Sequence, residues 1–292
     1  MSAIPQPVHS LTLRVPSPLE QLVDERLDDA GVRLLLKRDD LIHPDFPGNK
    51  WRKLKYNLGA ASDAGEKTLL TFGGAYSNHI QATAAAGHFF GFSTIGVIRG
   101  EEHSPLNPVL ASAVEHGMTL TYLDRTRYRS KTEIDRLHSE FGDFFLIPEG
   151  GSNRHGLWGC AELPAEIDTP FDVLCCASGT GTTLAGVACA LDSGQRAIGF
   201  SALKGGAFLE GDIARLQEDY GRITHNWTVE TGFHFGGFAR RDSELDDFVG
   251  DFRDRHGIAL DWVYEGKMMY GLFRLLQRGA FDPGTTLVAL LA

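Results

Sequence analysis

The sequence lacks the features that mark membrane, secreted and nucleic-acid-binding proteins. Over its 292 residues, no apolar run approaches the roughly 18 to 20 residues that a transmembrane helix needs. The N-terminal residues also lack the charged-then-apolar order of a secretory signal. The formal net charge is −10 and no long Lys/Arg run is present, so a basic surface for phosphate backbones is not expected. These absences predict a cytoplasmic protein that binds neither membranes nor nucleic acid and whose partner is a small molecule.

Cysteine is scarce and poorly placed for disulfides. Of the four cysteines, Cys175 and Cys176 adjoin inside an apolar run that is typical of a buried strand. Reduced thiols are therefore expected, and we interpret this pair as packing residues rather than nucleophiles. The histidines show no metal-ligand spacing with nearby Cys or acidic residues, so no metal site is predicted.

Internal repeats, low-complexity tracts and long Pro/Ser linkers are also absent, so ordered chain must cross any domain boundary. Short apolar runs recur instead between longer segments of helical periodicity. Strands that alternate with helices predict parallel sheets in an α/β fold. The expected strands are residues 68–72, 93–98, 118–123, 144–147, 171–176, 197–203, 226–231 and 285–291.

A short basic motif opens one of the predicted helices. In the run Pro47-Gly48-Asn49-Lys50-Trp51-Arg52-Lys53-Leu54, Lys50 and Lys53 lie three residues apart and so share one helical face. Two like charges so placed repel each other unless an anion binds there. The alternative interpretation is a solvated basic helix start, and these residues by themselves leave both open.

A glycine-rich loop follows the predicted strand 171–176 and precedes an apolar helix. It reads Ala177-Ser178-Gly179-Thr180-Gly181-Thr182-Thr183. A strand, glycine loop and helix in this order direct backbone N–H groups and the positive helix end at an anion. Leu184 occupies the third glycine position of a dinucleotide fingerprint, and the Gly-Lys-Ser/Thr of a nucleoside triphosphate loop is missing. The loop therefore favours a phosphate monoester, with a purely structural turn as the alternative.

A third segment, Phe72-Gly73-Gly74-Ala75-Tyr76-Ser77-Asn78-His79, also passes from a strand into a helix. Ser77 and Asn78 stand at capping positions, and helix capping alone would explain them. The same geometry would bind a substrate carboxylate at the helix N-terminus. Both interpretations stay open at this point.

Taken in order, these segments resemble the family of 1-aminocyclopropane-1-carboxylate (ACC) deaminases and D-cysteine desulfhydrases, which are tryptophan-synthase-β-like (fold type II) pyridoxal-phosphate enzymes. The likeness covers nearly the whole chain. Its motifs are Lys37-Arg38-Asp39-Asp40, residues 48–54, Ser77-Asn78, Pro148-Glu149-Gly150-Gly151-Ser152-Asn153, residues 179–183, and Asp261-Trp262-Val263-Tyr264-Glu265-Gly266-Lys267. The resemblance implies a two-lobed α/β fold, each lobe a mostly parallel sheet flanked by helices, and a homodimer. The large cofactor-binding domain would comprise residues 1–50 plus 161–292, and the small domain residues 51–160.

The resemblance also implies which residues bind the cofactor, pyridoxal 5'-phosphate. Lys50 would form a Schiff base with its aldehyde, and Lys53 would reach its phosphate. Asn78 would bond its phenolic oxygen, and Glu265 would lie near its pyridine nitrogen, where a carboxylate favours protonation. The phosphate cradle would consist of Thr180, Gly181, Thr182 and Thr183.

On the substrate side, the resemblance implies that Ser77 takes the carboxylate, with Asn78 and His79 beside it. Lys50 would serve as the base for substrate protons, and Tyr264 would stand beside the substrate as a nucleophile or proton carrier. For Tyr264 the alternative is a core aromatic residue with a satisfied hydroxyl.

The implied activity is a deaminating lyase that converts D-cysteine to pyruvate, sulfide and ammonia. The alternative is an ACC deaminase that yields 2-oxobutanoate and ammonia, because Glu265 follows Tyr264 as in those enzymes. Against it, Phe238 stands where ACC deaminases carry a second active-site tyrosine. A third hypothesis, of another class, is a non-catalytic binder of pyridoxal phosphate or another phosphorylated metabolite. It derives from the terminal Leu290-Leu291-Ala292, where relatives continue into a short glycine-containing loop beside the cofactor.

Overall fold

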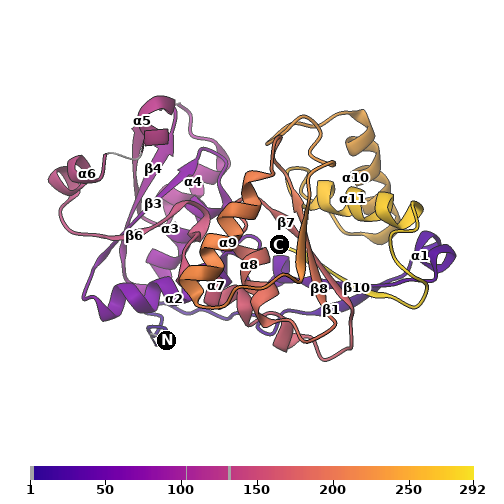
Figure 1. Ribbon diagram of the computed structural model, residues 1–292. Helices are drawn as coiled ribbons and strands as arrows, with labels where there is room; N and C mark the ends of the chain where they lie inside the picture. Colours follow the sequence, from indigo (N-terminus) through magenta and orange to yellow (C-terminus); the bar gives the residue numbers. More distant parts are fainter. Residues whose placement is uncertain (1–2, 103, 131–132) are drawn as a thin grey trace. The chain divides into compact units, whose positions relative to one another are not determined.

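The computed structural model describes residues 3–102, 104–130 and 133–292 (Figure 1). The chain divides into two compact units: unit 1 comprises Met1–Arg14 and Ile42–Gly159, and unit 2 comprises Val15–Leu41 and Cys160–Ala292. Residues 1–14 and 42–50 were expected in the large domain, and both segments fall in the same compact unit as residues 51–159. No helix in the described part of the chain is both long and apolar enough to cross a membrane.

Unit 1 is built on a four-stranded parallel sheet with the strand order β5-β4-β3-β6 (Figure 1). The strands are β3 (Thr68–Gly74), β4 (Ser93–Arg99), β5 (Met118–Leu123) and β6 (Phe145–Ile147). The helices are α2 (Lys50–Asp63), α3 (Asn78–Phe90), α4 (Pro108–Glu115), α5 (Arg125–Ser130), α6 (Ile134–Phe141) and α7 (Arg154–Ala161), the last of which ends in unit 2, with the 3₁₀ turn η2 (Glu149–Gly151).

The core of unit 1 lies on both faces of its sheet. Successive side chains of a strand point to opposite faces, so neighbouring residues of β3 belong to different clusters. Leu69 packs with Leu54 of α2 and Ala86 of α3. Leu70 packs in another cluster, which includes Leu137 of α6. Helices α2 and α3 therefore cover one face and α6 the other, and this placement holds the first turns of α2 and α3 near the sheet.

Unit 2 is built on a six-stranded sheet with the order β1-β2-β10-β7-β8-β9. Strand β1 is antiparallel to β2, and the other pairings of this sheet are parallel. The strands are β1 (Leu19–Leu22), β2 (Arg33–Arg38), β7 (Val173–Ser178), β8 (Arg196–Ser201), β9 (Trp227–Glu230) and β10 (Thr286–Leu291). The helices are α1 (Glu25–Ala30), α8 (Thr182–Ala190), α9 (Phe208–Tyr220), α10 (Ser243–His256) and α11 (Glu265–Gln277), with the 3₁₀ turns η1 (Asp39–Leu41) and η3 (Pro164–Glu166).

Both faces of this second sheet are covered by helices. Cys175 and Ala289 lie in one cluster with Phe252 of α10 and residues of α11. On the other face Leu184 of α8 packs so closely on β8 that a Cβ on Gly199 would lie 2.4 Å from its Cδ2 atom. All four cysteines are buried, and none of them forms a disulfide, as expected. Burial raises the pKa of the Cys175 thiol, which suits a packing residue.

The predicted α/β class is confirmed, and each predicted strand is present with its ends shifted by two residues at most. Strands β1 and β2 were not predicted. The apolar core of β2 is only Leu34-Leu35-Leu36, with arginine at both ends of the strand. A run this short does not separate a strand from a buried helical turn by periodicity.

Candidate active site

The basic motif of the sequence forms the first turn of α2 in unit 1. Lys50 is the first residue of the helix, is half-buried, and donates from Nζ to Oδ1 of Asn49 at 3.3 Å. Lys53, one turn later, is only 6% exposed. A solvated basic helix start does not describe a turn whose second lysine is buried.

Two close backbone approaches hold this turn in place. A Cβ on Gly159 of α7 would lie 1.8 Å from the carbonyl oxygen of Arg52, so the two helices meet there without an intervening side chain. Gly151 has a φ of 67°, and a Cβ at that position would lie 3.0 Å from Cβ of Lys53. The sequence motif that contains Gly151 gives no indication of a role for this residue. In the structure it makes room for Lys53.

The third segment forms the start of α3. Ser77 is the N-cap, and its Oγ accepts a long hydrogen bond of 3.4 Å from the backbone N–H of Ile80. A Cβ on Gly73 would lie 2.5 Å from Cγ1 of Ile80, so this turn requires glycine at that position. Asn78 is the first helical residue and is half-buried. The capping role of Ser77 is thus observed, while its role toward a carboxylate stays a prediction.

His79 lies in the interior of unit 1 as a neutral imidazole. The Thr71 hydroxyl donates to the carbonyl oxygen of Ile147 at 2.7 Å, so its oxygen accepts from Nε2 of His79 at 2.8 Å. Burial, together with the charges of Lys50 and Lys53, lowers the pKa of His79 to about 3. Nδ1 is buried without a hydrogen-bond partner among the described residues. The lysines therefore have an uncharged neighbour rather than a third cation.

In unit 2 the glycine-rich loop joins β7 to α8 as predicted. Gly181 is the N-cap of α8 with a φ of 77°, and a Cβ there would lie 2.7 Å from Cγ1 of Ile213. The helix start has no side-chain cap, and the first turn of a helix carries N–H groups without intrahelical partners. Thr180 and Thr182 approach each other through their Oγ1 atoms at 3.1 Å, and the side chains of Thr182 and Thr183 are buried.

Tyr264 lies directly against this loop. A Cβ on Gly179 would lie 3.1 Å from Cε1 and 3.3 Å from the hydroxyl oxygen of Tyr264, so glycine is what admits the ring. The backbone of Tyr264 is held by Asp261, whose carboxylate accepts from the N–H groups of Val263, Tyr264 and Glu265. Sequence reasoning missed this role of Asp261, although an acidic residue just before a helix is a capping signal.

Glu265, the first residue of α11, is buried and holds backbone groups. Its Oε1 accepts from the N–H of Ala292 at 2.5 Å, and its Oε2 accepts from the N–H of Asp261 at 3.2 Å. Burial, and next the charge of Asp261, raises the pKa of Glu265 to about 8. The predicted position near the pyridine nitrogen stays a prediction, and the observed role is to join the end of β10 to the start of α11.

The raised pKa of Glu265 makes the stability of the cofactor-free protein depend on pH. The folded chain keeps the proton up to about pH 8, whereas an unfolded glutamate releases it near its ordinary pKa of 4.5. The folded state binds more protons over this range, so the free energy of unfolding is expected to fall as the pH rises through it. Urea unfolding of the wild type and of Glu265→Gln measures the effect. If the free energy of unfolding changed with pH equally in the wild type and in Glu265→Gln, this prediction would be contradicted.

The Lys37-Arg38-Asp39-Asp40 motif proves to be structural. Lys37 is fully buried in β2, where Nζ donates to the carbonyl oxygen of Ser17 at 2.6 Å and pairs with Glu166 at 2.9 Å. Arg38 pairs with Asp40 at 2.8 Å. These bonds tie η1 and η3 to the sheet of unit 2.

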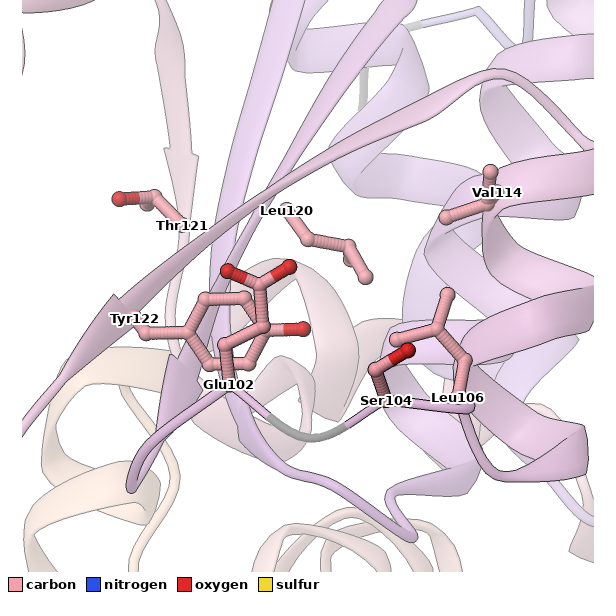
Figure 2. A pocket seen from close by; sticks show the side chains of 7 residues that line it. All are labelled: Glu102, Ser104, Leu106, Val114, Leu120, Thr121 and Tyr122. Carbon is pink, nitrogen blue, oxygen red and sulfur yellow. The ribbon is translucent and has the colours of Figure 1, made fainter.

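Unit 1 also contains a pocket of about 450 Å³ that is lined by none of the predicted site residues (Figure 2). Figure 2 shows the carboxylate of Glu102 and the ring of Tyr122 near each other, with the side chains of Leu106 and Val114 to their right. The lining residues are Glu102, Ser104, Leu106, Val114, Leu120, Thr121 and Tyr122. This pocket is therefore separate from the residues that the sequence motifs indicate.

In an α/β fold, a glycine loop that leads from a strand into a helix is typical of proteins that bind phosphate groups. The sequence profile of the pyridoxal-phosphate dependent enzyme family matches residues 12–292, and the chain belongs to that family. A putative ACC deaminase of Pyrococcus horikoshii is 29% identical over 86% of this chain and 82% of its own. A mitochondrial bifunctional D-cysteine desulfhydrase/ACC deaminase of Arabidopsis thaliana is 28% identical over 92% of this chain and 73% of its own. The crystal structure of an ACC deaminase homologue matches with a TM-score of 0.82 and 26% identity, over 98% of this chain and 91% of the other.

The predicted family, cofactor class and enzyme class are confirmed by these comparisons. The residues present also fit the cofactor. Lys50 supplies a primary amine for an aldehyde, and the uncapped start of α8 supplies the donors that a phosphate ester needs. Next to each of these segments lies a buried polar atom without a partner among the described residues: Nδ1 of His79 in unit 1 and Oγ of Ser178 in unit 2. Native proteins rarely bury such atoms unpaired, which is consistent with a bound group nearby.

Proposed function

We propose that the protein is a deaminating lyase that converts D-cysteine to pyruvate, sulfide and ammonia. The observation that carries the choice of substrate is the pair formed by Tyr264 and Phe238. Their ring centroids lie 5.9 Å apart in an edge-to-face arrangement. Phe238 lies in the segment that resembles the one carrying the second active-site tyrosine of ACC deaminases. This segment does reach Tyr264, but it brings an apolar ring where those enzymes have a hydroxyl. The release of sulfur from D-cysteine needs one proton donor, and we assign that role to the hydroxyl of Tyr264.

The cofactor residues are proposed as follows. The amine of Lys50 binds the cofactor aldehyde and then accepts the proton from Cα of the substrate. Lys53 and the glycine loop hold the phosphate, to which each charge-assisted hydrogen bond contributes about 1.5 to 3 kcal/mol. When bound, the pyridine ring of the cofactor accepts the electrons that the Cα–H bond leaves behind.

The substrate residues are proposed as the resemblance implies them. The N-terminus of α3, with Ser77 and Asn78, takes the substrate carboxylate. The neutral His79 is the next residue of that helix. The Cβ–S bond breaks with its electron pair leaving on sulfur, and the hydroxyl of Tyr264 supplies a proton to that sulfur. Cβ then takes up the proton that Lys50 removed from Cα, and solvent returns a proton to Tyr264. Water replaces the nitrogen, which yields pyruvate and ammonia.

A second candidate substrate is ACC, which would give 2-oxobutanoate and ammonia. It is favoured by Glu265, which follows Tyr264 as in the deaminases, and by the names of several relatives at 29% identity or less.

A substrate panel of D-cysteine, L-cysteine, ACC and D-serine, read by keto-acid release, tests the proposal. We expect D-cysteine to react fastest, and ACC to have a kcat/KM lower by at least about 100-fold, because a missing proton carrier costs roughly 10² to 10⁴ in rate. The variant Phe238→Tyr restores a hydroxyl and is expected to raise the ACC rate. Faster turnover of ACC than of D-cysteine by the wild type would reverse the assignment. Failure of every substrate with cofactor bound would favour the non-catalytic binder.

The proposal extends to a homodimer, which the resemblance implies, and to a cytoplasmic location, which the lack of a long apolar run favours. Light scattering of the purified protein is expected to give twice the mass of the chain.

A further inference from the structure

Lys267 is a buried lysine to which the proposed reaction gives no role. It lies in the first turn of α11, is 2% exposed, and donates from Nζ to the carbonyl oxygen of Gly237 at 2.7 Å. No carboxylate lies within ion-pair distance of it in the part of the chain that the structure describes. Burial lowers the pKa of its ammonium, and the charge of Asp261 acts in the opposite direction. Burying a cation against a single carbonyl is unfavourable, so we expect this hydrogen bond to stabilise the conformation of the segment that accepts it.

The loop that receives this bond has an unfavourable backbone. Phe235, Gly236, Gly237 and Ala239 have φ angles of 52°, 87°, 122° and 50°. For the two non-glycine residues, this left-handed region costs about 1 to 2 kcal/mol each. The loop's own bonds include one from the N–H of Arg240 to the carbonyl oxygen of Gly237 at 3.1 Å. The ammonium of Lys267 binds that same oxygen, at the centre of the strained segment.

The loop and the start of α11 are also joined by two aromatic contacts. The ring of Phe235 lies edge-on against Tyr270 at 4.8 Å, and the ring of Phe238 lies edge-to-face against Tyr264 at 5.9 Å. Tyr264 is the N-cap of α11, and Lys267 is three residues further along. Because Lys267 binds the carbonyl just before Phe238, it fixes the residue that faces Tyr264.

We propose that Lys267 is a positioning residue that holds residues 235–239 in their strained conformation and so keeps the ring of Phe238 against Tyr264. It thereby maintains the apolar side of the substrate position, which selects D-cysteine over substrates that need a second hydroxyl. The part about substrate choice rests on the proposed function, and the part about the loop does not.

Hydrogen exchange tests the loop directly. In Lys267→Met, which keeps the length of the stem but removes the donor, the loop amides of Gly236, Gly237 and Arg240 are expected to exchange at least about tenfold faster, the lower bound for loss of a hydrogen bond to a charged group. The matched control is Lys204→Met, an exposed lysine whose Cβ lies 3.3 Å from the position of a Cβ on Gly237. Its loop amides are expected to exchange as in the wild type. Unchanged exchange in Lys267→Met would overturn the proposal whatever the substrate is.

The ratio of kcat/KM for D-cysteine to kcat/KM for ACC tests the consequence, because a general loss of stability would lower both values together. The ratio is expected to fall in Lys267→Met. It is also expected to fall in Phe238→Tyr, which keeps Lys267 and the ring against Tyr264 but adds the hydroxyl that ACC turnover needs, and which should leave loop exchange unchanged. A faster-exchanging loop with an unaltered ratio would overturn the role in substrate choice. If Lys267→Met does not fold, Lys267→Leu, which also lacks a donor, takes its place, and wild-type exchange in that variant counts against the proposal. A wild type inactive on D-cysteine would refute the proposed function but not the loop result.

Discussion

Replacing Lys50 by alanine is expected to abolish turnover of D-cysteine, with kcat lower by at least about 1000-fold. The amine both binds the cofactor aldehyde and accepts the substrate proton, and no other residue of the first turn of α2 is placed to supply both functions. Lys53, the other lysine proposed to contact the cofactor, is assigned to its phosphate. The measurement is keto-acid release, together with the visible absorption of the lysine-bound cofactor, which should disappear.

Two control variants separate chemistry from charge and folding. Lys50→Arg keeps a cation but cannot bind the aldehyde, so it should be as inactive as Lys50→Ala. Lys67→Ala removes an exposed lysine from the same unit and should keep wild-type activity. An unchanged visible spectrum in Lys50→Ala would show that another amine holds the cofactor.

Replacing Gly159 by alanine is expected to destabilise unit 1 by about 3 kcal/mol, near the upper end of typical overpacking costs. The new Cβ would lie 1.8 Å from the carbonyl oxygen of Arg52, and backbone cannot yield as a flexible side chain does. Helices α2 and α7 must separate, which moves the turn that carries Lys50 and Lys53. We therefore expect weaker cofactor binding as well as a lower free energy of unfolding, measured by urea denaturation.

Gly211→Ala is the matched control for this variant. Gly211 also lies within a helix, α9, but a Cβ there would meet no atom within 4 Å. Alanine is favoured over glycine in helix interiors by about 0.8 to 1 kcal/mol, so this variant should be slightly stabilised. A Gly159→Ala protein as stable as Gly211→Ala would show that α7 does not approach α2 as closely as the structure has it.

Much of the fold was predictable because its signals are local. Strands such as β7 and β10 are continuous apolar runs, as expected for parallel strands that are buried on both faces. Strand β2 escaped prediction because its apolar core is only three residues long and its parallel neighbour β10 comes from the other end of the chain. The buried Lys37 also makes the strand hard to recognise, because the groups that accommodate its ammonium, Ser17 and Glu166, lie elsewhere in the sequence.

The sequence by itself determined the α/β class, the family and the cofactor. Hydrophobic periodicity and the order of motifs such as Gly48-Asn49-Lys50 are properties of the linear sequence and need no knowledge of the fold. Only the tertiary structure decided that His79 is neutral, that Glu265 binds the N–H of Ala292, and that Lys267 holds the carbonyl before Phe238. The physical reason is that these states depend on burial and on partners far away in the sequence. The partner of Glu265 lies 27 residues away, and that of Lys267 lies 30 residues away. Folding brings such groups into contact and removes the water that would otherwise solvate them.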